Sequence, residues 1–458
     1  MHDTIAAIST PFGEGAIALL RISGARAISI ADEIFHGKTK PSASAPRLQQ
    51  FGKILDGPTV IDDVLLTLFR APASYTGEDI VEIACHGGIL VTRRILQLLL
   101  ARGARSAGPG EFTQRAFLNG KMDLTQAEAV MDLIRAQTDL ALRAATEQLE
   151  GRLGEKIRTL REQLLALLAH VEAFIDFPDE DIGPDTGATL LIKLKQVRDG
   201  IATLLRTADH GKILREGVRT VIYGAPNVGK SSLLNILLGY ERAIVSETPG
   251  TTRDTIEEVI NLRGIPLRLI DTAGIRETTD HVEREGIERT QKQIERADLA
   301  LCIFDAHRPP LDQASGLALE SFEDPRGRAI ALLNKSDLGE DRGWCSFADP
   351  DQPFPAVRIS CKTGGGMEQL ADAIFQRIMG GNIATADASI AINTRHQSCL
   401  QKASEYCTAA KRAIEDQLSA EFIAIELRAA LDSVGEVVGK VDSEELLGVI
   451  FSTFCIGK

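Results

Sequence analysis

A glycine-rich stretch near the middle of the chain has the residue types and the spacing of a phosphate-binding loop. It reads Gly224-Ala225-Pro226-Asn227-Val228-Gly229-Lys230-Ser231, with an apolar segment at 218–223 before it and a leucine-rich segment at 232–239 after it. These flanks predict a strand and a helix, which favours a nucleotide site over a chance turn. Backbone N–H groups of such a loop surround phosphate oxygens, and the helix N-terminus adds a positive dipole. We expect Lys230 to reach the β- and γ-phosphates and Ser231 to hold Mg²⁺.

Three later stretches, each at the end of an expected strand, indicate which nucleotide binds. Asp271-Thr272-Ala273-Gly274 offers a carboxylate for Mg²⁺ and an N–H for a γ-phosphate. Asn334-Lys335-Ser336-Asp337 offers a carboxylate that can accept both guanine N–H donors, a pair that adenine lacks. Ser360-Cys361-Lys362 would back the base. Together with Thr251 and Thr252 these stretches match the guanine-nucleotide set of translation-factor-like GTPases, although 334–337 alone would be a capped turn.

The group that orients the attacking water departs from the common pattern. Ras-like enzymes carry a glutamine after their Asp-x-x-Gly, and this chain has Ile275 there, which cannot orient water. Hydrolysis must therefore use another carboxylate or amide, a cation or a partner. The side-chain oxygen of Asn227 could bind a monovalent cation beside the phosphates. Glu283 is the nearest suitable carboxylate, but the residues alone favour a surface glutamate at the start of a helix over 283–295.

Alternating strands and helices over residues 218–379 are expected to hold these motifs at the strand ends of a mostly parallel sheet. Arg263-Gly264 predicts a tight hairpin between the second and third strands, so that one edge strand is antiparallel. The expected strands are Val218–Tyr223, Thr255–Asn261, Pro266–Asp271, Leu299–Phe304, Ala329–Asn334 and Ala356–Ser360.

The first hundred residues predict a separate α+β domain. Arg21 interrupts an apolar run, and the pattern alone favours an edge-facing arginine over a ligand contact. Glu82 lies inside another expected strand. The expected strands are 4–9, 16–23, 51–54, 64–69 and 79–85, with helices over 25–35 and 89–101.

Helical periodicity replaces this pattern from Thr125 onward. Thr125-Gln126-Ala127-Glu128 predicts a capping box, and apolar residues at 149–171 recur every three or four positions. The acidic stretch 176–181 favours a solvated turn over a metal site. Helices are also expected over 190–205, 397–415, 421–434 and up to 451. Because the two helical blocks flank the α/β unit, the simplest architecture is a helical domain with the nucleotide-binding domain inserted into it.

Length and composition limit the remaining possibilities. A chain of 458 residues suggests two to four domains, and a net charge of −13 indicates that any RNA is held by a partner or a local patch. The seven cysteines are scattered without zinc spacing, which favours reduced thiols and a cytoplasmic protein. No secretory leader and no run of about 20 apolar residues is present, which disfavours secretion and membrane insertion.

Three stretches give the whole chain a resemblance to the MnmE (TrmE) family of tRNA-modification GTPases. They are Gly250-Thr251-Thr252-Arg253-Asp254, Pro109-Gly110-Glu111-Phe112 with Arg115-Ala116-Phe117-Leu118-Asn119, and the tail Phe454-Cys455-Ile456-Gly457-Lys458. The resemblance implies a multidomain fold that combines α/β and all-α parts. A folate-binding, dimerising α+β domain would span 1–118, a helical domain 119–216 and 380–458, and an inserted Ras-like P-loop GTPase domain 217–379.

The resemblance also implies how the nucleotide is held and hydrolysed. K⁺ would take the place of an arginine finger on Asn227, Ser246, Thr248 and Thr251, and Mg²⁺ would lie on Ser231 and Thr252. At 246 the family often has threonine, and serine keeps the backbone carbonyl. Glu283 falls on the water-orienting glutamate, and two GTPase domains would meet across the K⁺ site. The implied GTP contacts are Asn227, Val228, Gly229, Lys230, Ser231, Ser232, Ser246, Glu247, Thr248, Pro249, Gly250, Thr251, Thr252, Asp271, Thr272, Ala273, Gly274, Asn334, Lys335, Asp337, Ser360, Cys361 and Lys362.

A second implied site would bind a tetrahydrofolate derivative, 5-formyl- or methylene-tetrahydrofolate, at Arg21, Glu82, Lys121 and Lys458. The resemblance implies a homodimer that forms a heterotetramer with an MnmG-like protein using FAD and NADH. Together they would add an aminomethyl-type (carboxymethylaminomethyl) group at C5 of the wobble uridine of certain tRNAs. The resemblance makes Cys455 a candidate for that chemistry. Two alternatives for this cysteine are a prenylation signal, which Gly457 and Lys458 fit poorly, and a buried structural thiol.

Two other functions use the same nucleotide motifs. A ribosome-assembly GTPase would act as a binding switch, but the folate-matching positions and the Cys-Ile-Gly-Lys tail disfavour it. A nucleotide kinase is disfavoured by the stretch 334–337.

Overall fold

The computed structural model describes residues 3–176, 187–239, 258–270, 297–309, 328–344, 356–379, 391–439 and 444–458. The chain divides into two compact units that each combine separated stretches. Unit 1 consists of residues 1–131, 149–179 and 419–458, and unit 2 of residues 132–148 and 180–418. Among the helices of the described residues, none is long and apolar enough to cross a membrane.

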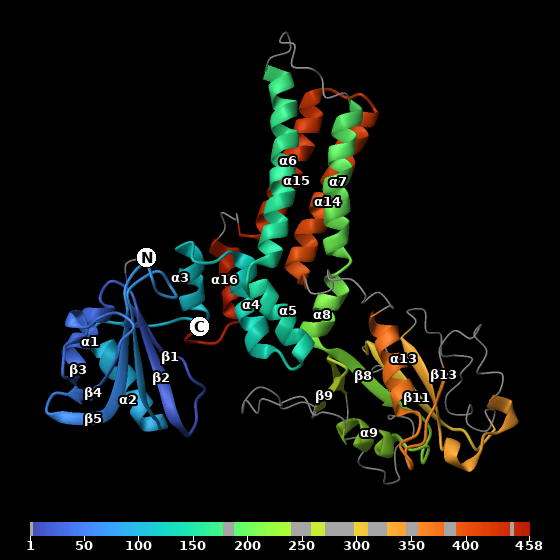
Figure 1. Ribbon diagram of the computed structural model, residues 1–458, viewed down its shortest axis with the longest axis horizontal. Helices are drawn as coiled ribbons and strands as arrows, with labels where there is room; N and C mark the ends of the chain where they lie inside the picture. Colours follow the sequence, from blue (N-terminus) through green and yellow to red (C-terminus); the bar gives the residue numbers. More distant parts are fainter. Residues whose placement is uncertain are drawn as a thin grey trace. The chain divides into compact units, whose positions relative to one another are not determined.

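The first unit is built on a seven-stranded sheet with the order β3-β4-β5-β6-β2-β1-β7 (Figure 1). Its strands are antiparallel except for the pair β1–β7. They are β1 (Ile5–Ile8), β2 (Gly15–Ser23), β3 (Phe35–Gly37), β4 (Gln49–Asp56), β5 (Thr59–Phe69), β6 (Ile80–Gly87) and β7 (Arg105–Ser106). All five strands expected for this region are present, with shifted ends, whereas β3 and β7 were not predicted.

One face of this sheet carries the core of the α+β region. Alternate residues of β2, such as Leu20 and Ile22, are fully buried against helices α1 (Ala27–Ile34) and α2 (Ile89–Ala101). A period of two in burial is what a strand with one covered face requires. The helix predicted over 89–101 has those bounds.

The other helices of unit 1 come from distant parts of the sequence. They are α3 (Glu111–Leu118), α4 (Leu124–Arg135), α6 (Arg152–Asp176), α15 (Ala420–Val437) and α16 (Glu444–Ser452). The stripe of α6 is buried as predicted, including Leu153 and Leu164, and α6 packs against α15. Figure 1 shows α16, near the end of the chain, beside α3.

The capping box of α4 differs from the prediction. Asp123 Oδ1 accepts a hydrogen bond from Gln126 N at 3.0 Å, and Gln126 Oε1 accepts one from Asp123 N at 3.0 Å. The reciprocal pair therefore starts two residues before Thr125, whose hydroxyl donates to Asp123 instead. An aspartate caps a helix as well as a threonine does, so the sequence alone left both registers open.

The second unit contains a six-stranded sheet with the order β13-β12-β11-β8-β10-β9. As predicted, its strands are parallel except for β9, an edge strand joined to β10 by the hairpin at Arg263-Gly264. The strands are β8 (Val218–Tyr223), β9 (Glu258–Leu262), β10 (Ile265–Leu269), β11 (Leu299–Asp305), β12 (Ala329–Asn334) and β13 (Ala356–Arg358). Helices α9 (Lys230–Gly239) and α13 (Met367–Met379) share its core.

Within the described residues, unit 2 contains four further α-helices. They are α5 (Asp139–Leu149), whose last residue falls in unit 1, α7 (Gly187–Leu205), α8 (Ala208–Glu216) and α14 (Thr394–Glu415). α7 packs against α14. α8 packs closely against the backbone of Ile392. Arg215 donates a hydrogen bond to Ile392 O at 2.7 Å, and a Cβ added to Gly211 would meet the same oxygen at 2.5 Å. The helices expected for one helical domain are therefore divided between the two units, and the domain bounds remain a prediction.

Candidate functional site

The phosphate-binding loop joins β8 to α9 with the backbone that the motif requires. Asn227 and Gly229 have φ of 63° and 109°, in the left-handed region that asparagine and glycine tolerate. At Gly224 a Cβ would meet Ile303 O at 2.3 Å, so only glycine fits. Lys230 Nζ donates to Gly224 O and Ala225 O, both at 2.9 Å, and burial lowers the pKa of this amine. The loop is therefore folded round its lysine in the form that fits a phosphate group.

A single buried amide joins three of the predicted motifs. Asn334 Nδ2 donates to Val228 O at 2.7 Å, and Asn334 Oδ1 accepts from Cys361 N at 2.9 Å. A Cβ on Gly229 would meet Asn334 Nδ2 at 2.2 Å. Asn334 thus connects the phosphate loop to the segment 360–362.

Asp337, the predicted guanine-reading aspartate, is exposed and held in place by the next motif. Ser360 Oγ donates to Asp337 Oδ1 at 2.6 Å, and this hydrogen bond holds the pKa of the Asp337 carboxyl below its ordinary value. Lys362 also lowers it by charge. An ionised carboxylate with a fixed orientation is what two guanine N–H donors need as acceptor.

Sequence reasoning missed one residue of this site, Asp305. It ends β11 directly opposite Asn334, is 5% exposed, and its Oδ2 lies 2.6 Å from Lys335 Nζ. Lys335 has a φ of 65°, so its backbone also adopts the left-handed region. The sequence did contain a signal for Asp305, because its carboxylate follows directly after the apolar run 299–304.

The rest of the predicted nucleotide site lies outside the described residues. This holds for the catalytic candidate Glu283, for Ile275, and for Ser246, Glu247, Thr248, Pro249, Gly250, Thr251, Thr252, Asp271, Thr272, Ala273 and Gly274. Ser231 and Ser232 are exposed at the start of α9. Within the described ranges no group of three or more His, Cys, Asp or Glu side chains could hold a metal ion by itself.

The predicted folate residues Arg21 and Glu82 form an ion pair across β2 and β6. Arg21 Nε and Nη2 both donate to Glu82 Oε1, at 2.9 and 2.7 Å, and the two residues are paired in register. Because β2 lies between β6 and β1, the edge-facing interpretation of Arg21 is wrong. Its guanidinium carbon lies 5.5 Å from the ring centroid of Tyr75 and 5.7 Å from that of Phe112. A cation between two rings is thus paired with a carboxylate, and its side chain is only 15% exposed.

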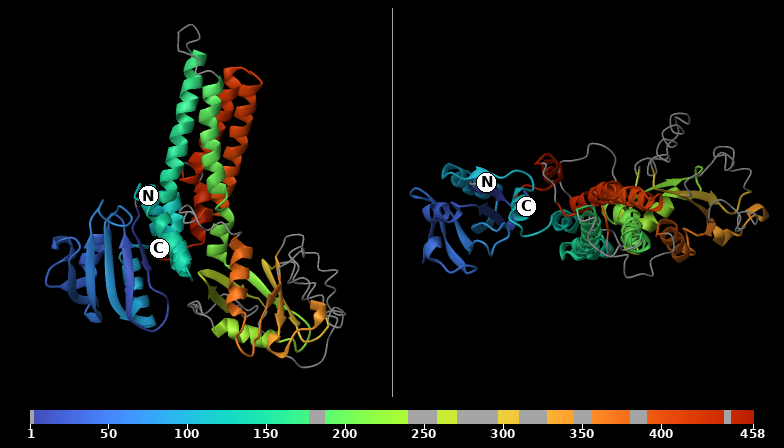
Figure 2. Two further views of the ribbon diagram at one scale, coloured as in Figure 1. Left: turned by 45° about the vertical axis from the view of Figure 1, so that its right-hand side comes forward. Right: turned by 90° about the horizontal axis from the view of Figure 1, so that it is seen from above.

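The end of the chain docks on the same region, as both views of Figure 2 show. Phe112 N donates to Lys458 O at 3.1 Å, and Pro109 forms an antiparallel bridge with Ile456. Ser9 Oγ donates to Gly457 O at 3.2 Å. These contacts bring the backbone of Lys458, the fourth predicted folate residue, to Phe112, whose ring contacts Arg21.

Lys121 and Cys455 have more peripheral positions. Lys121 Nζ donates to Pro72 O at 3.1 Å, which ties it to the loop 71–79 that carries Tyr75. Cys455 is exposed, so the interpretation as a buried structural thiol is wrong. Its carbonyl accepts from Gly110 N at 3.3 Å, which fixes the backbone and leaves the thiol accessible.

Comparisons with known proteins cover the whole chain. A family model described as the MnmE helical domain matches residues 124–455, and one described as the GTP-binding protein TrmE N-terminus matches residues 4–121. The tRNA modification GTPase MnmE of Akkermansia muciniphila is 50% identical over 462 residues, which cover 99% of each chain. The proteins of that name from Clostridioides difficile and Bacillus subtilis are 45% and 46% identical, over 100% of both chains.

Proposed function

The chain belongs to the MnmE family of tRNA modification GTPases, and on this premise we propose that it is a K⁺-dependent GTPase that drives modification of the wobble uridine. The observation that supports the nucleotide half is the arrangement of Asn334, Asp337 and Ser360, in which a carboxylate is held in one orientation after β12, where the base would bind. GTP would lie with its phosphates in the loop 224–231. Mg²⁺, held by Ser231 and Thr252, would neutralise phosphate charge.

The proposed hydrolysis uses residues of the phosphate loop and residues outside it. Lys230 would bind phosphate oxygens and Glu283 would orient the attacking water. Asn227, Ser246, Thr248 and Thr251 would hold a K⁺ ion that offsets negative charge beside the phosphates. The left-handed backbone of Asn227 supports its part, because it places a carboxamide within the loop itself.

A cation exchange tests the K⁺ role. We expect hydrolysis to be at least about tenfold faster in KCl than in NaCl, because a cation replaces a stabilising charge of the transition state. Asn227→Gly removes the side-chain oxygen while tolerating the φ of 63°, and should abolish the difference between the salts. Asn235→Ala, an exposed change on α9, is the control. Equal rates in both salts for the unmodified protein would overturn the K⁺ role.

The folate half of the proposal places a tetrahydrofolate one-carbon donor at Arg21, Glu82, Lys121 and Lys458. Such a ligand combines a flat heteroaromatic ring with carboxylates. The cation between two aromatic rings and the cationic residues near it support a site of that chemistry.

The proposal includes a homodimer formed by the α+β region. The face of the seven-stranded sheet opposite α1 and α2 carries exposed large apolar side chains on β4, β5 and β2. Ile17, Phe51 and Leu65 are 69%, 67% and 38% exposed, and Phe51 pairs directly with Leu65. An open apolar sheet face supports covering by a second copy. Phe51→Lys should convert a dimer into a monomer in sedimentation, and an unchanged dimer would place the interface elsewhere.

Installation of the carboxymethylaminomethyl group at C5 would require an MnmG-like partner with FAD and NADH, in a cytoplasmic heterotetramer. Nucleoside mass spectrometry of tRNA from cells that lack this protein is the decisive experiment. We expect the wobble modification to disappear and to return with the intact gene. Unchanged wobble uridines would overturn the proposal and favour a ribosome-assembly switch.

A further inference from the structure

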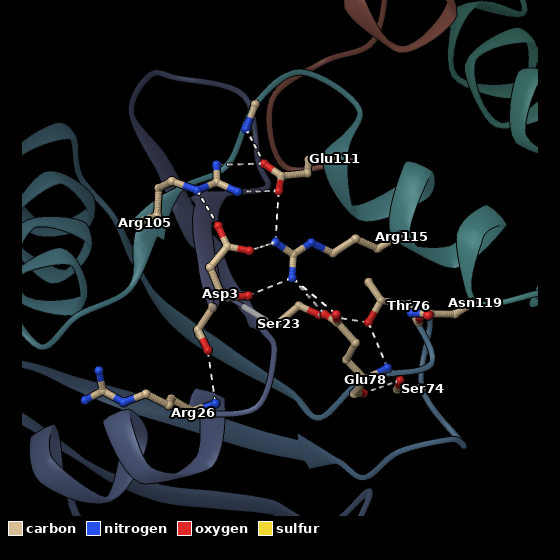
Figure 3. Close-up of polar contacts among 12 residues, drawn as sticks. Asp3, Ser23, Arg26, Ser74, Thr76, Glu78, Arg105, Glu111, Arg115 and Asn119 are labelled. Carbon is tan, nitrogen blue, oxygen red and sulfur yellow. Dashed lines mark hydrogen bonds and ion pairs between the residues drawn. The ribbon is translucent and has the colours of Figure 1, made fainter. Parts of the chain in front are cut away.

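An ion cluster with a buried centre joins Asp3, Glu78, Arg105, Glu111 and Arg115 (Figure 3), of which Asp3 and Arg105 are exposed. Arg115 is the centre and is 2% exposed. Its Nη1 donates to Asp3 O at 2.9 Å and to Glu78 Oε2 at 3.1 Å. Its Nη2 donates to Asp3 Oδ1 and to Glu111 Oε1, both at 2.9 Å. One guanidinium therefore binds three separate segments of the chain.

Arg105 closes the cluster from the other side. It donates to Asp3 Oδ2 at 2.7 Å and to Glu111 Oε1 at 2.6 Å. Burial opposes the ionisation of Glu111, but hydrogen bonds from Arg105, Gly108 N and Arg115 outweigh it, so the pKa of Glu111 lies below its ordinary value. The Glu111 carboxylate is therefore ionised beside the two arginines.

The segments tied by Arg115 are those that carry the two rings beside Arg21. Glu78 ends the loop 71–79, and Ser23 Oγ also donates to Glu78 Oε2, at 2.7 Å. That loop carries Tyr75, whose hydroxyl lies 2.9 Å from Thr113 Oγ1 on α3. The other tied segment is α3, where Glu111 is followed by Phe112. The contacts of Arg115 with Glu78 and Glu111 thus join the loop that carries Tyr75 to the helix that carries Phe112.

We propose that Glu78 and Arg115 are positioning residues for the site around Arg21, because they tie together the loop that carries Tyr75 and the helix that carries Phe112, whose rings contact the Arg21 guanidinium. The inference rests on the proposed folate function and deepens it. Buried ion clusters add little net stability compared with apolar packing, and their best-supported role is to select one geometry among several. Without the cluster, the loop 71–79 keeps its Tyr75–Thr113 contact and the hydrogen bond from Asn119 to Thr76 O, but loses its ionic tie to α3.

The test compares two glutamate-to-glutamine variants in the full-length protein. Glu78→Gln keeps the size of the side chain and removes the charge that Arg115 binds. Glu33→Gln makes the same change in an exposed pair, in which Arg102 Nη1 lies 3.1 Å from Glu33 Oε2. Titration calorimetry with 5-formyl-tetrahydrofolate should show affinity at least about tenfold weaker for Glu78→Gln and within about twofold of the unmodified protein for Glu33→Gln. Hydrogen exchange of the β4–β6 amides confirms that the sheet remains folded.

A spectroscopic measurement follows the ring itself. The chain has four tyrosines, so fluorotyrosine incorporation gives few fluorine resonances, and Tyr75→Phe identifies that of Tyr75. We expect Glu78→Gln to move the Tyr75 resonance in the absence of ligand, a change that a role in global stability alone would not cause. If Glu78→Gln folds poorly, Ser23→Ala removes one hydrogen bond to the same carboxylate and should act in the same direction more weakly.

The outcomes separate this inference from the proposed function. Failure of the unmodified protein to bind 5-formyl-tetrahydrofolate would overturn the folate function, while the Tyr75 resonance would still decide whether the cluster positions the ring. Normal folate affinity in Glu78→Gln together with an unmoved Tyr75 resonance would overturn the positioning role.

Discussion

Burial divides the cysteines into two chemical classes at the scale of single residues. Burial raises the pKa of the thiols of Cys85, Cys361 and Cys407 to about 11 each, whereas Cys455 is exposed. Because the thiolate is the reactive form, we expect iodoacetamide at about pH 8 to alkylate Cys455 well before Cys85 or Cys407. Raising the pH toward 11 should increase the alkylation rate of the buried thiols only to the extent that the reagent can reach them. Peptide mass spectrometry checks the order, and equally fast labelling of Cys407 would contradict it.

Asp337 provides the second prediction at this scale. Asp337→Asn replaces a double acceptor with a side chain that also donates, so preference for GTP over XTP should fall by at least about a hundredfold. Ser360→Ala removes only the hydrogen bond that orients the carboxylate and should have a smaller effect. Hydrolysis rates for both nucleotides measure the preference. An undiminished preference for GTP in Asp337→Asn would show that guanine is read elsewhere.

At the scale of elements, buried strands follow from the sequence and short paired strands do not. Val218–Tyr223 and Ala329–Asn334 have the predicted bounds because each is an uninterrupted, mostly apolar run that ends at a motif. In contrast, β7 is the polar pair Arg105–Ser106, which is a strand only because it pairs with β1. α3 starts at Gly110, whose φ of 64° and close contact with Phe454 depend on a tail more than 300 residues away.

The same distinction explains which site residues were predictable. Asn334 and Asp337 lie in a motif with fixed spacing after a strand, so local sequence was sufficient. The position of Arg21 depends on the strands on both sides of β2, and its contacts with Tyr75 and Phe112 come from two distant segments. The local pattern favoured an edge-facing Arg21, because the sequence of one strand contains no information about the order of strands in the sheet.

The hairpin between β9 and β10 gives a prediction about packing against α5. Gly264 has a φ of 88°, and a Cβ there would lie 2.5 Å from Leu140 Cδ1. Gly264→Ala should destabilise unit 2 by about 1–3 kcal/mol, through backbone strain and the clash together. Gly339→Ala is a matched control, because Gly339 has a φ of 96° and no atom within 4 Å of the added Cβ.

Thermal unfolding separates the two contributions. The melting temperature should fall more for Gly264→Ala than for Gly339→Ala. Leu140→Ala should lower the melting temperature less in the Gly264→Ala background than in the unmodified protein, because the smaller side chain also relieves the clash with the added Cβ. Equal effects of the two glycine changes would mean that the hairpin does not press on α5.

At the scale of the whole molecule, sequence order and spatial order differ. The α+β region, α6 and the last forty residues form one unit, so the first strand and the C-terminal tail become neighbours only after the intervening chain has been synthesised. The candidate nucleotide site and the candidate folate site lie in different units. The two activities should therefore be separable by mutation even though the proposed function requires both.

Cys455 allows the sharpest test of that separation. Cys455→Ser changes an exposed thiol in unit 1 and leaves the backbone contacts of the tail in place, so GTP hydrolysis should stay within about twofold of normal. If the thiol takes part in the chemistry, tRNA from cells that carry only this variant should lack the wobble modification. Cells that carry only Ser452→Ala, an exposed change three residues earlier, are the control and should retain the modification. Hydrolysis assays and nucleoside mass spectrometry provide the two measurements. Normal modification with Cys455→Ser would assign the tail a docking role through its backbone alone.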